Sequence, residues 1–319
     1  MGLLNCRAAP DPIATLDWNA PLDATPAPAS PLPRLHTDGN ALLAPDGTRV
    51  VLRGVNVCSL EFDRDGANWE LTDQGSDVLR VLAERWGANV VRMPVNQEWF
   101  LTDEDYVLRV ERLIDDANAR GLYIVLDVQW EVGRKLDPYH ANILELPTFG
   151  AGNTTEAFWH KAVSRLAKRT NVLYDLINEA HGFPEKETAA AMQTLIDAIR
   201  TRDQETVIVV SGMDWAHTLD YYRTHPLHGG NLVYSAHQYL PYDQPRTFPG
   251  KWARAAAELP VLLGEFLADD ATYALAVVDA AEAASAVGWM PWALGCGFAK
   301  DDDLTKEPLI TLAARMRSR

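Results

Sequence analysis

Eight short apolar runs rich in β-branched residues recur along this 319-residue chain, and they most constrain its fold. They span residues 51–57, 89–95, 122–128, 172–178, 206–212, 231–236, 259–265 and 288–294. The runs lack polar alternation, which is typical of parallel strands that are buried on both faces. The segments between them can each hold a helix, so the pattern predicts repeated strand–helix units. Eight such units close a (β/α)8 TIM barrel of the α/β class.

Amphipathic helical patterns fill the intervals between the runs. The clearest has Thr102 and Asp105 at capping-box spacing, and Gly121 is expected to end the helix. Its apolar face consists of Tyr106, Val110, Leu113, Ile114 and Ala117. Three tryptophans within such helical periodicity are expected in the core: Trp86, Trp159 and Trp252. An open doubly wound sheet is disfavoured, because no glycine-rich phosphate turn follows the first strand.

The first part of the chain differs from the rest. Seven prolines fall between Pro10 and Pro33 with no periodicity, which predicts an extended arm over residues 1–38. The remaining residues, 39–319, are assigned to the barrel domain. A turn at Asp46-Gly47 between two short β runs predicts an N-terminal β-hairpin ahead of the barrel.

The net charge and the apolar runs limit the classes of partner that the chain can be expected to bind. The formal net charge is −15 and the pI is about 4.9, whereas nucleic acids and anionic membranes select Lys/Arg-rich surfaces. No apolar run reaches the roughly 18 residues of a membrane helix. The chain start lacks a basic region followed by an apolar one. The protein is therefore expected to be secreted if a signal peptide was removed, and otherwise cytoplasmic.

Neither cysteines nor histidines are spaced as metal ligands. The three cysteines are Cys6, Cys58 and Cys296, without a CxxC motif, and free or packed thiols are favoured over one bridge. Four histidines have no ligand-like spacing with one another: His140, His217, His225 and His228. The acidic run at residues 301–303 is interpreted as a solvated loop rather than a calcium site, and residues 153–155 as a helix cap. No metal or cofactor is expected, because nucleotide-binding and metalloprotease motifs are absent where they would be meaningful.

The active site of such a barrel lies at the carboxyl ends of its strands. The polar and aromatic residues that close or follow the runs are Asn56, Glu61, Arg92, Asp127, Gln129, Trp130, Asn178, Glu179, Ser211, Asp214, Trp215, His237, Tyr239, Glu265 and Trp292. Asp127 is expected to brace the barrel rim. Two glutamates three strands apart, surrounded by Trp, Arg, Asn, His and Tyr, are an inventory for carbohydrate processing. Indole faces stack on sugar rings, and two carboxyl groups supply the acid/base and the nucleophile.

Taken together, these segments resemble glycoside hydrolase family 5, the cellulase and mannanase type of clan A. The resemblance is carried in order by LRGVN, VVRMPV, GLYIVLD, INEAHG, SGMDWA, SAHQYLP, LLGEF and GWMPWAL, over about residues 41–294. It implies that Glu179 is the general acid/base and Glu265 the nucleophile. Asn178 would bond the sugar 2-hydroxyl, and His237 would lie near Glu179.

The resemblance also implies supporting residues and marks two departures. Arg92 and Tyr239 would bond Glu265 and keep it ionised, since a cation and a donor lower the pKa of a carboxyl group. Trp292 would stack under the sugar. The family usually has His where this chain has Gln129, so Gln129 and Trp130 are expected to be loose substrate contacts. Ala180 stands where the family commonly has Pro, which loosens the turn after Glu179.

The implied function is a retaining β-glycosidase that acts on a β-linked polysaccharide or oligosaccharide. Endo-β-1,4-glucanase is the first expectation, with β-mannanase and an exo-acting β-glucosidase or β-mannosidase as alternatives. Endo versus exo action should depend on the loops at residues 131–153 and 240–250. A non-catalytic carbohydrate-binding barrel and a metal-dependent hydrolase are the rival classes. The expected partner is the glycan alone, bound by a monomer.

Overall fold

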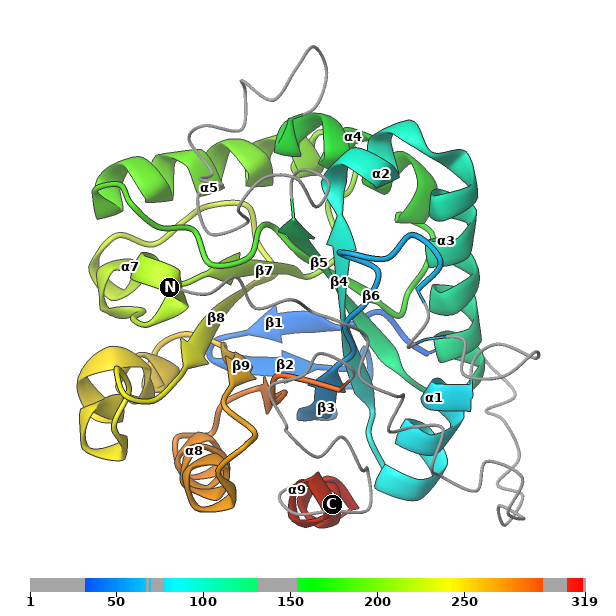
Figure 1. Ribbon diagram of the computed structural model, residues 1–319. Helices are drawn as coiled ribbons and strands as arrows, with labels where there is room; N and C mark the ends of the chain where they lie inside the picture. Colours follow the sequence, from blue (N-terminus) through cyan, green and yellow to red (C-terminus); the bar gives the residue numbers. More distant parts are fainter. Residues whose placement is uncertain (1–31, 67–68, 70–76, 131–153, 295–308, 318–319) are drawn as a thin grey trace, which may run out of the picture.

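Eight parallel strands close into a barrel (Figure 1) in the computed structural model, which describes residues 32–66, 69, 77–130, 154–294 and 309–317. The strands are β3 Leu52–Asn56, β4 Val90–Asn96, β5 Tyr123–Trp130, β6 Val172–Asp175, β7 Ile208–Ser211, β8 Leu232–Gln238, β9 Val261–Phe266 and β10 Gly288–Trp289. They pair in chain order, and β10 closes the circle between β9 and β3. Each of the eight predicted runs supplies one strand, so the (β/α)8 prediction is confirmed.

Helices surround the barrel (Figure 1). They are α1 Asp77–Arg80, η2 Val81–Trp86, α2 Gln97–Thr102, α3 Glu104–Ala119, α4 Thr155–Leu166, α5 Glu185–Arg200, α6 Met213–Ala216, α7 Asp220–Thr224, η5 Pro245–Thr247, η6 Pro249–Ala253, η7 Ala255–Ala257, α8 Ala271–Ala283 and α9 Leu309–Arg317. The C-terminal α9 packs against α8 and η2, and its Leu312 and Met316 are fully buried. Helix α9 therefore completes the helix layer between α8 and η2, on the side of the barrel where the last strand, β10, pairs with the first, β3.

Side chains alternate between the inside of the barrel and the helix layer. On β4, Val90 joins the apolar cluster inside the barrel, whereas Val91 and Met93 pack in the outer cluster beneath the helices. Arg92, two residues after Val90, points inward on the layer above it, because successive side chains of a strand face opposite ways. An apolar plug thus fills the lower barrel, and a buried polar layer lies above it, toward the strand carboxyl ends.

The lower end of the barrel is closed by the residues that precede β3. Strands β1 His36–Asp38 and β2 Ala41–Leu43 form an antiparallel pair, and Leu35 and Leu42 join the inner apolar cluster. The predicted turn at Gly47 is present, since Leu43 bridges to Arg49 in antiparallel fashion. Strand β1 was not predicted; it lies in the segment that the sequence assigned to the arm.

Two local predictions need correction. The N-cap of α3 is Asp103, whose side chain accepts a hydrogen bond from the Tyr106 backbone N–H; Thr102 belongs to the preceding helix α2. Cys58 is disulfide-bonded, with a partner outside the described residues, whereas the sequence favoured free thiols. Other local predictions are confirmed: Thr154 caps α4, Gly121 follows α3 with φ 76°, and the three helical tryptophans are buried.

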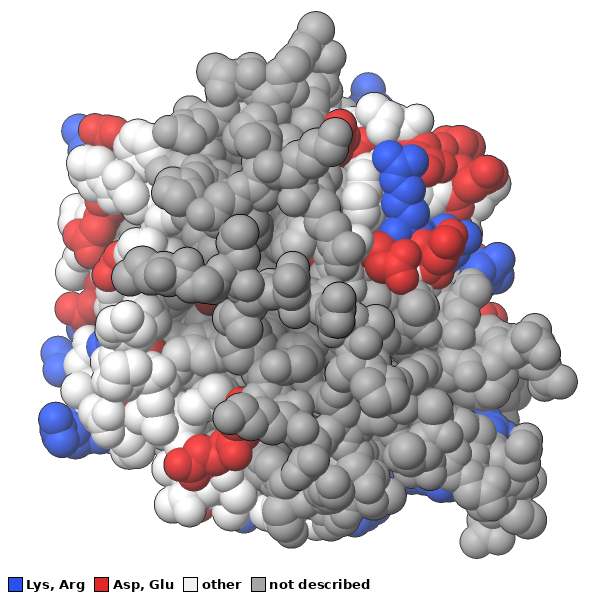
Figure 2. Space-filling model, in the orientation of Figure 1, with Lys and Arg blue, Asp and Glu red and all other residues white. Residues whose placement is uncertain are grey.

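Acidic and basic side chains are interspersed over the described part of the face in Figure 2. Some charged side chains pair across helices: Arg165 with Glu111 at 2.7 Å and Arg169 with Asp115 at 2.8 Å. Pairs near the surface such as these add little stability. Within the described ranges, no helix has the length and apolar character that a membrane crossing requires.

Candidate active site

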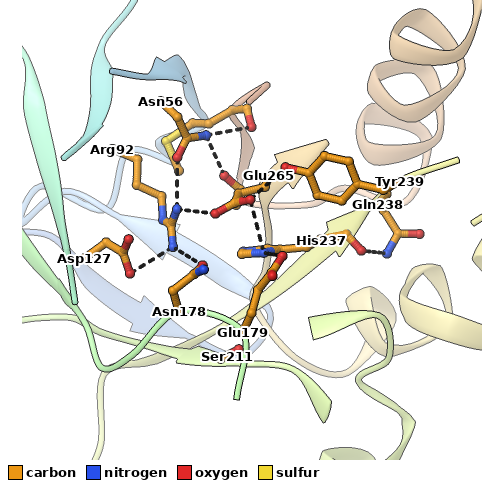
Figure 3. Close-up of polar contacts among 12 residues, drawn as sticks. Asn56, Arg92, Asp127, Asn178, Glu179, Ser211, His237, Gln238, Tyr239 and Glu265 are labelled. Atoms are coloured by element: carbon orange, nitrogen blue, oxygen red, sulfur yellow. Dashed lines mark hydrogen bonds and ion pairs between the residues drawn. The ribbon is translucent and has the colours of Figure 1, made fainter. Parts of the chain in front are cut away.

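Six of the predicted residues meet at the carboxyl ends of the strands (Figure 3). They are Arg92 on β4, Asn178 and Glu179 after β6, His237 on β8, Tyr239 after β8 and Glu265 on β9. Parallel strands in a closed barrel all end at the same rim, so residues distant in sequence converge there.

Glu265 is held by two donors, one on each carboxylate oxygen. Arg92 Nη1 lies 2.6 Å from Oε1, and the Tyr239 hydroxyl donates to Oε2 at 2.7 Å. The side chain of Glu265 is only 4% exposed. Burial raises its pKa above the ordinary value, while His237, Arg92 and Tyr239 oppose that rise. The predicted contacts are present, but burial outweighs them, so the expected lowering of the pKa is not the net result.

Glu179 lies opposite with fewer donors. Its Oε1 is 2.9 Å from His237 Nδ1, and its side chain is 22% exposed. Its backbone has φ 47°, in the left-handed region, and its carbonyl oxygen contacts His181 Nδ1 at 2.7 Å. Burial raises the pKa of Glu179 to about 7, against the lowering effect of Arg92 and His217. A carboxylic acid with this pKa can hold a proton near neutral pH and also release it.

The two glutamates are close enough to act on one bond. One carboxylate oxygen of each, together with a ring nitrogen of His237, lie within 4.8 Å of one another. Retaining glycosidases place their carboxyl groups about 5–5.5 Å apart, and inverting ones about 6.5–9.5 Å apart to admit a water. One oxygen of each carboxyl group thus lies closer to the other than inverting enzymes allow, which favours the retaining geometry.

The same three side chains have the spacing of a metal-ligand set. Both oxygens of Glu265, however, already accept from Arg92 and Tyr239, and the guanidinium brings a positive charge to one of them. A divalent cation there would meet that charge at close range and displace a donor. The donor set fits proton and glycosyl transfer better than metal binding.

Arg92 organises the floor of the site. Its nitrogens contact Asp127 and Asp175 at 2.9 Å each, Asn56 at 3.0 Å and Asn178 at 3.1 Å, besides Glu265. Burial works against the charge of Arg92, but the surrounding carboxylates outweigh it and its pKa is raised overall. The prediction that Asp127 braces the barrel is consistent with this ion pair.

His237 is the neutral link between the two glutamates. Its Nδ1 lies 2.9 Å from Glu179 Oε1 and 3.6 Å from Glu265 Oε2, and the ring is almost fully buried. Burial lowers the pKa of His237 to about 4, against the effect of Glu265. The imidazole is therefore uncharged above about pH 5 and can hydrogen-bond Glu179 without neutralising it.

Three other predicted residues lie at the rim without a described contact to the glutamates. Gln129 and Trp130 end β5; Gln129 is half-buried, and the Trp130 ring packs against Phe62 at 6.0 Å. Trp292 is 8% exposed, and its backbone N–H donates to Phe266 at 2.9 Å. Their roles toward a sugar stay predictions. Residues 131–153 and 301–303, including His140, lie outside the described part of the chain.

The sequence placed Asn56 and Glu61 at the end of the first strand but assigned neither of them a role in the site. Asn56 donates to the Gly264 and Met290 carbonyls and accepts from Arg92, so it joins β3 to the nucleophile side of the rim. Glu61 is 2% exposed, and its Oε2 accepts from the Ser59 N–H; burial raises its pKa to about 8. Asn56 ends β3 and Glu61 follows it, and this position at the rim was the only signal that the sequence offered.

The model of the family Cellulase (glycosyl hydrolase family 5) matches residues 43–296. Endoglucanase E-5 of Thermobifida fusca is 29% identical over 255 residues, which are 76% of this chain and 50% of that protein. Endoglucanase MaCel5A of Microbulbifer sp. is 28% identical over 186 residues, 57% of this chain and 33% of that protein. The chain thus spans half or less of the length of these curated relatives.

Solved structures show the same fold. The catalytic domain of the Thermobifida fusca endoglucanase superposes with a TM-score of 0.72 at 22% identity, covering 90% of this chain and 98% of that one. A β-glucanase of Saccharophagus degradans gives a TM-score of 0.73 at 21% identity, covering 94% and 98%. Both proteins have also been solved with cellotetraose.

Proposed function

This chain belongs to glycosyl hydrolase family 5, and we propose that it hydrolyses a β-linked glucan with retention of configuration, as an endo-β-1,4-glucanase. The observation that carries the proposal is the closeness of Glu179 and Glu265: one carboxylate oxygen of each lies within 4.8 Å of the other, beside His237. That distance suits a double displacement in which one carboxyl group attacks and the other transfers a proton.

In the first step, Glu265 attacks the anomeric carbon of the sugar. The bond from that carbon to the glycosidic oxygen breaks as Glu179 gives its proton to the departing oxygen. Glu265 has two donors and Glu179 has one neutral imidazole partner, so Glu265 ionises first and the proton stays on Glu179. Arg92 and Tyr239 hold the attacking carboxylate in place.

In the second step, water attacks the same anomeric carbon. Glu179, now a carboxylate, takes a proton from the water, and the bond to Glu265 breaks. The two inversions restore the starting configuration. Asn178, whose Oδ1 accepts a hydrogen bond from Arg92 at 3.1 Å, would bond the sugar 2-hydroxyl in both steps.

A glucan is the favoured substrate class. The relatives reported above carry the names endoglucanase and β-glucanase, and two of them have been solved with cellotetraose. Trp215 and Tyr242 add aromatic faces, 38% and 72% exposed, in the loops after β7 and β8. Such rings stack on sugars, so they support binding of a chain longer than one residue. The β-mannanase and exo-acting alternatives have no comparable support.

The remaining parts of the proposal concern the whole protein. We assign residues 1–38 to an arm and 39–319 to the catalytic domain, which acts as a monomer. The disulfide at Cys58 supports a secreted protein, because such bonds persist in oxidising compartments.

A panel of substrates tests the proposal. The purified protein would be given β-1,4-glucan, β-1,3-glucan, mannan, xylan and aryl β-glycosides, with product lengths and anomeric configuration followed by NMR. We expect internal cleavage of β-1,4-glucan and a β-configured first product. An α-configured first product, or full turnover by Glu265→Gln, would overturn it. Activity lost in EDTA and restored by a divalent cation would instead favour a metal-dependent reaction.

A further inference from the structure

A second carboxylate–histidine contact lies next to the proposed acid/base. Asp243, in the segment after β8, is fully buried and faces groups from three parts of the chain. Its Oδ2 lies 2.8 Å from His217 Nδ1 and accepts from the Tyr239 backbone N–H at 2.8 Å. Its Oδ1 is paired with the ammonium of Lys251 on η6. The Asp243 side chain thus ties Tyr239, which supports Glu265, to His217 in the loop that follows the neighbouring strand β7.

The surroundings of Asp243 favour its charged form. Burial raises the pKa of a carboxyl group, but here His217, Lys251 and the Tyr239 N–H outweigh it, and the pKa of Asp243 is lowered. An ionised carboxylate in a buried position must be paired and hydrogen-bonded, and Asp243 meets both conditions. It therefore acts as a fixed negative charge under the loop that carries His217.

His217 is held in one orientation by this carboxylate. It follows α6, its side chain is 18% exposed, and its ring packs against Tyr242 at 5.9 Å. Burial lowers the pKa of His217 and Lys251 acts in the same direction. Asp243 and, more weakly, Glu179 outweigh them, so the pKa of His217 is raised overall. The imidazolium form is thus favoured beside the site.

That positive charge acts on Glu179. Arg92, His217 and His181 favour the anion of Glu179, whereas Asp243 and the nearby carboxylate of Glu265 oppose it. His237 touches Glu179 directly but is neutral above about pH 5, because burial lowers its pKa to about 4. Of the two histidines that contact a carboxylate near this site, His217 is therefore the one whose charged form is favoured.

We propose that Asp243 and His217 form a positioning unit that holds an imidazolium beside Glu179 and so sets the pH range in which Glu179 can deliver its proton. This rests on the proposed role of Glu179 as acid/base. Asp243 also steadies the Tyr239 backbone, so the unit joins the two halves of the catalytic apparatus. Neither residue touches the reacting atoms.

The sign of the effect follows from the charge. A cation near Glu179 favours its anion and lowers its pKa, so removing the cation raises that pKa. Glutamine at position 217 can still donate to Asp243 but carries no charge. In His217→Gln, the alkaline limb of kcat/KM should therefore move to higher pH, by about half a unit to one unit.

The matched control is His225→Gln. His225 is exposed, follows α7 and stacks on Tyr221 at 4.3 Å, away from both glutamates. The same replacement there should leave the pH profile unchanged. A profile of His217→Gln that coincides with the wild type would overturn the proposal, whatever its effect on the maximal rate, because a purely structural brace would lower the rate without moving the limb.

A titration without substrate separates this inference from the proposed function. The ring nitrogens of His217 would be followed by NMR in the intact wild-type chain, and the Glu179 carboxyl carbon in wild type and His217→Gln. We expect His217 to be protonated at pH 6.5 and the Glu179 pKa to rise in the variant. A neutral His217 at that pH would overturn the proposal even if the variant failed to fold. Failure to hydrolyse any glycan, with these titrations as expected, would instead overturn the proposed function alone.

Discussion

Arg92 and Glu265 form an ion pair at 2.6 Å inside the barrel, where the two side chains are 0% and 4% exposed. The guanidinium also contacts Asp127 and Asp175, so a single cation faces three buried carboxyl groups. Buried charges are tolerated only where pairing and hydrogen bonds replace water, and removal of one partner leaves the others without compensation. Arg92 is therefore as much a part of the barrel's stability as of the site.

Replacing Arg92 should damage folding and activity to different degrees. Arg92→Ala leaves three carboxyl groups without their cation and should destabilise the protein by about 3–5 kcal/mol. Arg92→Lys keeps the charge but not the fork that reaches Asp175, Asn56 and Glu265 together. We expect it to retain the fold and lose on the order of a hundredfold in kcat/KM. Thermal unfolding and kinetics on β-1,4-glucan separate the two effects.

The control for this pair is Arg223→Lys. Arg223 makes a surface pair with Glu258 at 2.6 Å, and pairs of this kind contribute little to stability. Neither Tm nor kcat/KM should change appreciably. Equal activity of Arg92→Lys and Arg223→Lys would show that the buried fork does not hold the nucleophile.

Tyr239→Phe removes the hydroxyl that donates to Glu265 Oε2 at 2.7 Å. A donor to a carboxylate favours the anion, so its loss raises the pKa of Glu265. The acidic limb of kcat/KM should move to higher pH, and the rate should fall about ten- to a hundredfold, since hydrogen bonds to charged groups contribute about 1.5–3 kcal/mol. A pH–rate profile measures both. A limb that moves to lower pH would contradict the assignment.

Wild-type activity should be bell-shaped in pH. Glu179 must be protonated for the first step, and burial raises its pKa to about 7, so activity should fall as pH rises through that value. Glu179→Ala should lose about a thousandfold on glucan but much less on aryl glycosides whose leaving groups need no proton. A flat profile from pH 4 to 9, or equal losses on both substrates, would exclude the acid/base role.

The barrel could be predicted because parallel strands that are buried on both faces appear in the sequence as continuous apolar runs. Each of the eight runs, from LRGVN to GWMPWAL, formed a strand in order, and the rim rule then located Glu179, Glu265, Arg92 and His237 together. The α3 cap was misassigned because Thr102 and Asp103 are both good caps. Their choice depends on where α2 ends, and α2 includes Thr102.

Other parts of the site depend on register and on contacts between loops. Asp175 faces Arg92 only because β6 pairs with β5 in a register that places Asp175 beside Asp127. His217 and Asp243 lie in loops that follow different strands, and nothing in the sequence around either residue predicts their contact. The disulfide at Cys58 is likewise a matter of spatial proximity, because cysteine number does not fix connectivity.

Gly264, immediately before Glu265, shows how tightly the site is packed. A Cβ there would lie 2.2 Å from Ser235 Oγ and 3.0 Å from His237 Nε2, distances that require the neighbours to shift. Gly264→Ala should displace the His237 ring, weaken its contact with Glu179, and cost about 1–3 kcal/mol of stability. We expect a large loss of kcat with a lower Tm.

Gly250→Ala is the matched control, because a Cβ at that position has no atom within 4 Å. It should leave kcat unchanged and keep Tm at or slightly above the wild-type value, since alanine restricts the unfolded chain. In Gly264→Ala, the rate on aryl glycosides with good leaving groups should fall less than the rate on glucan, because the displaced ring serves Glu179 rather than Glu265. Equal losses on the two substrates would show that the added methyl group disturbs the nucleophile instead.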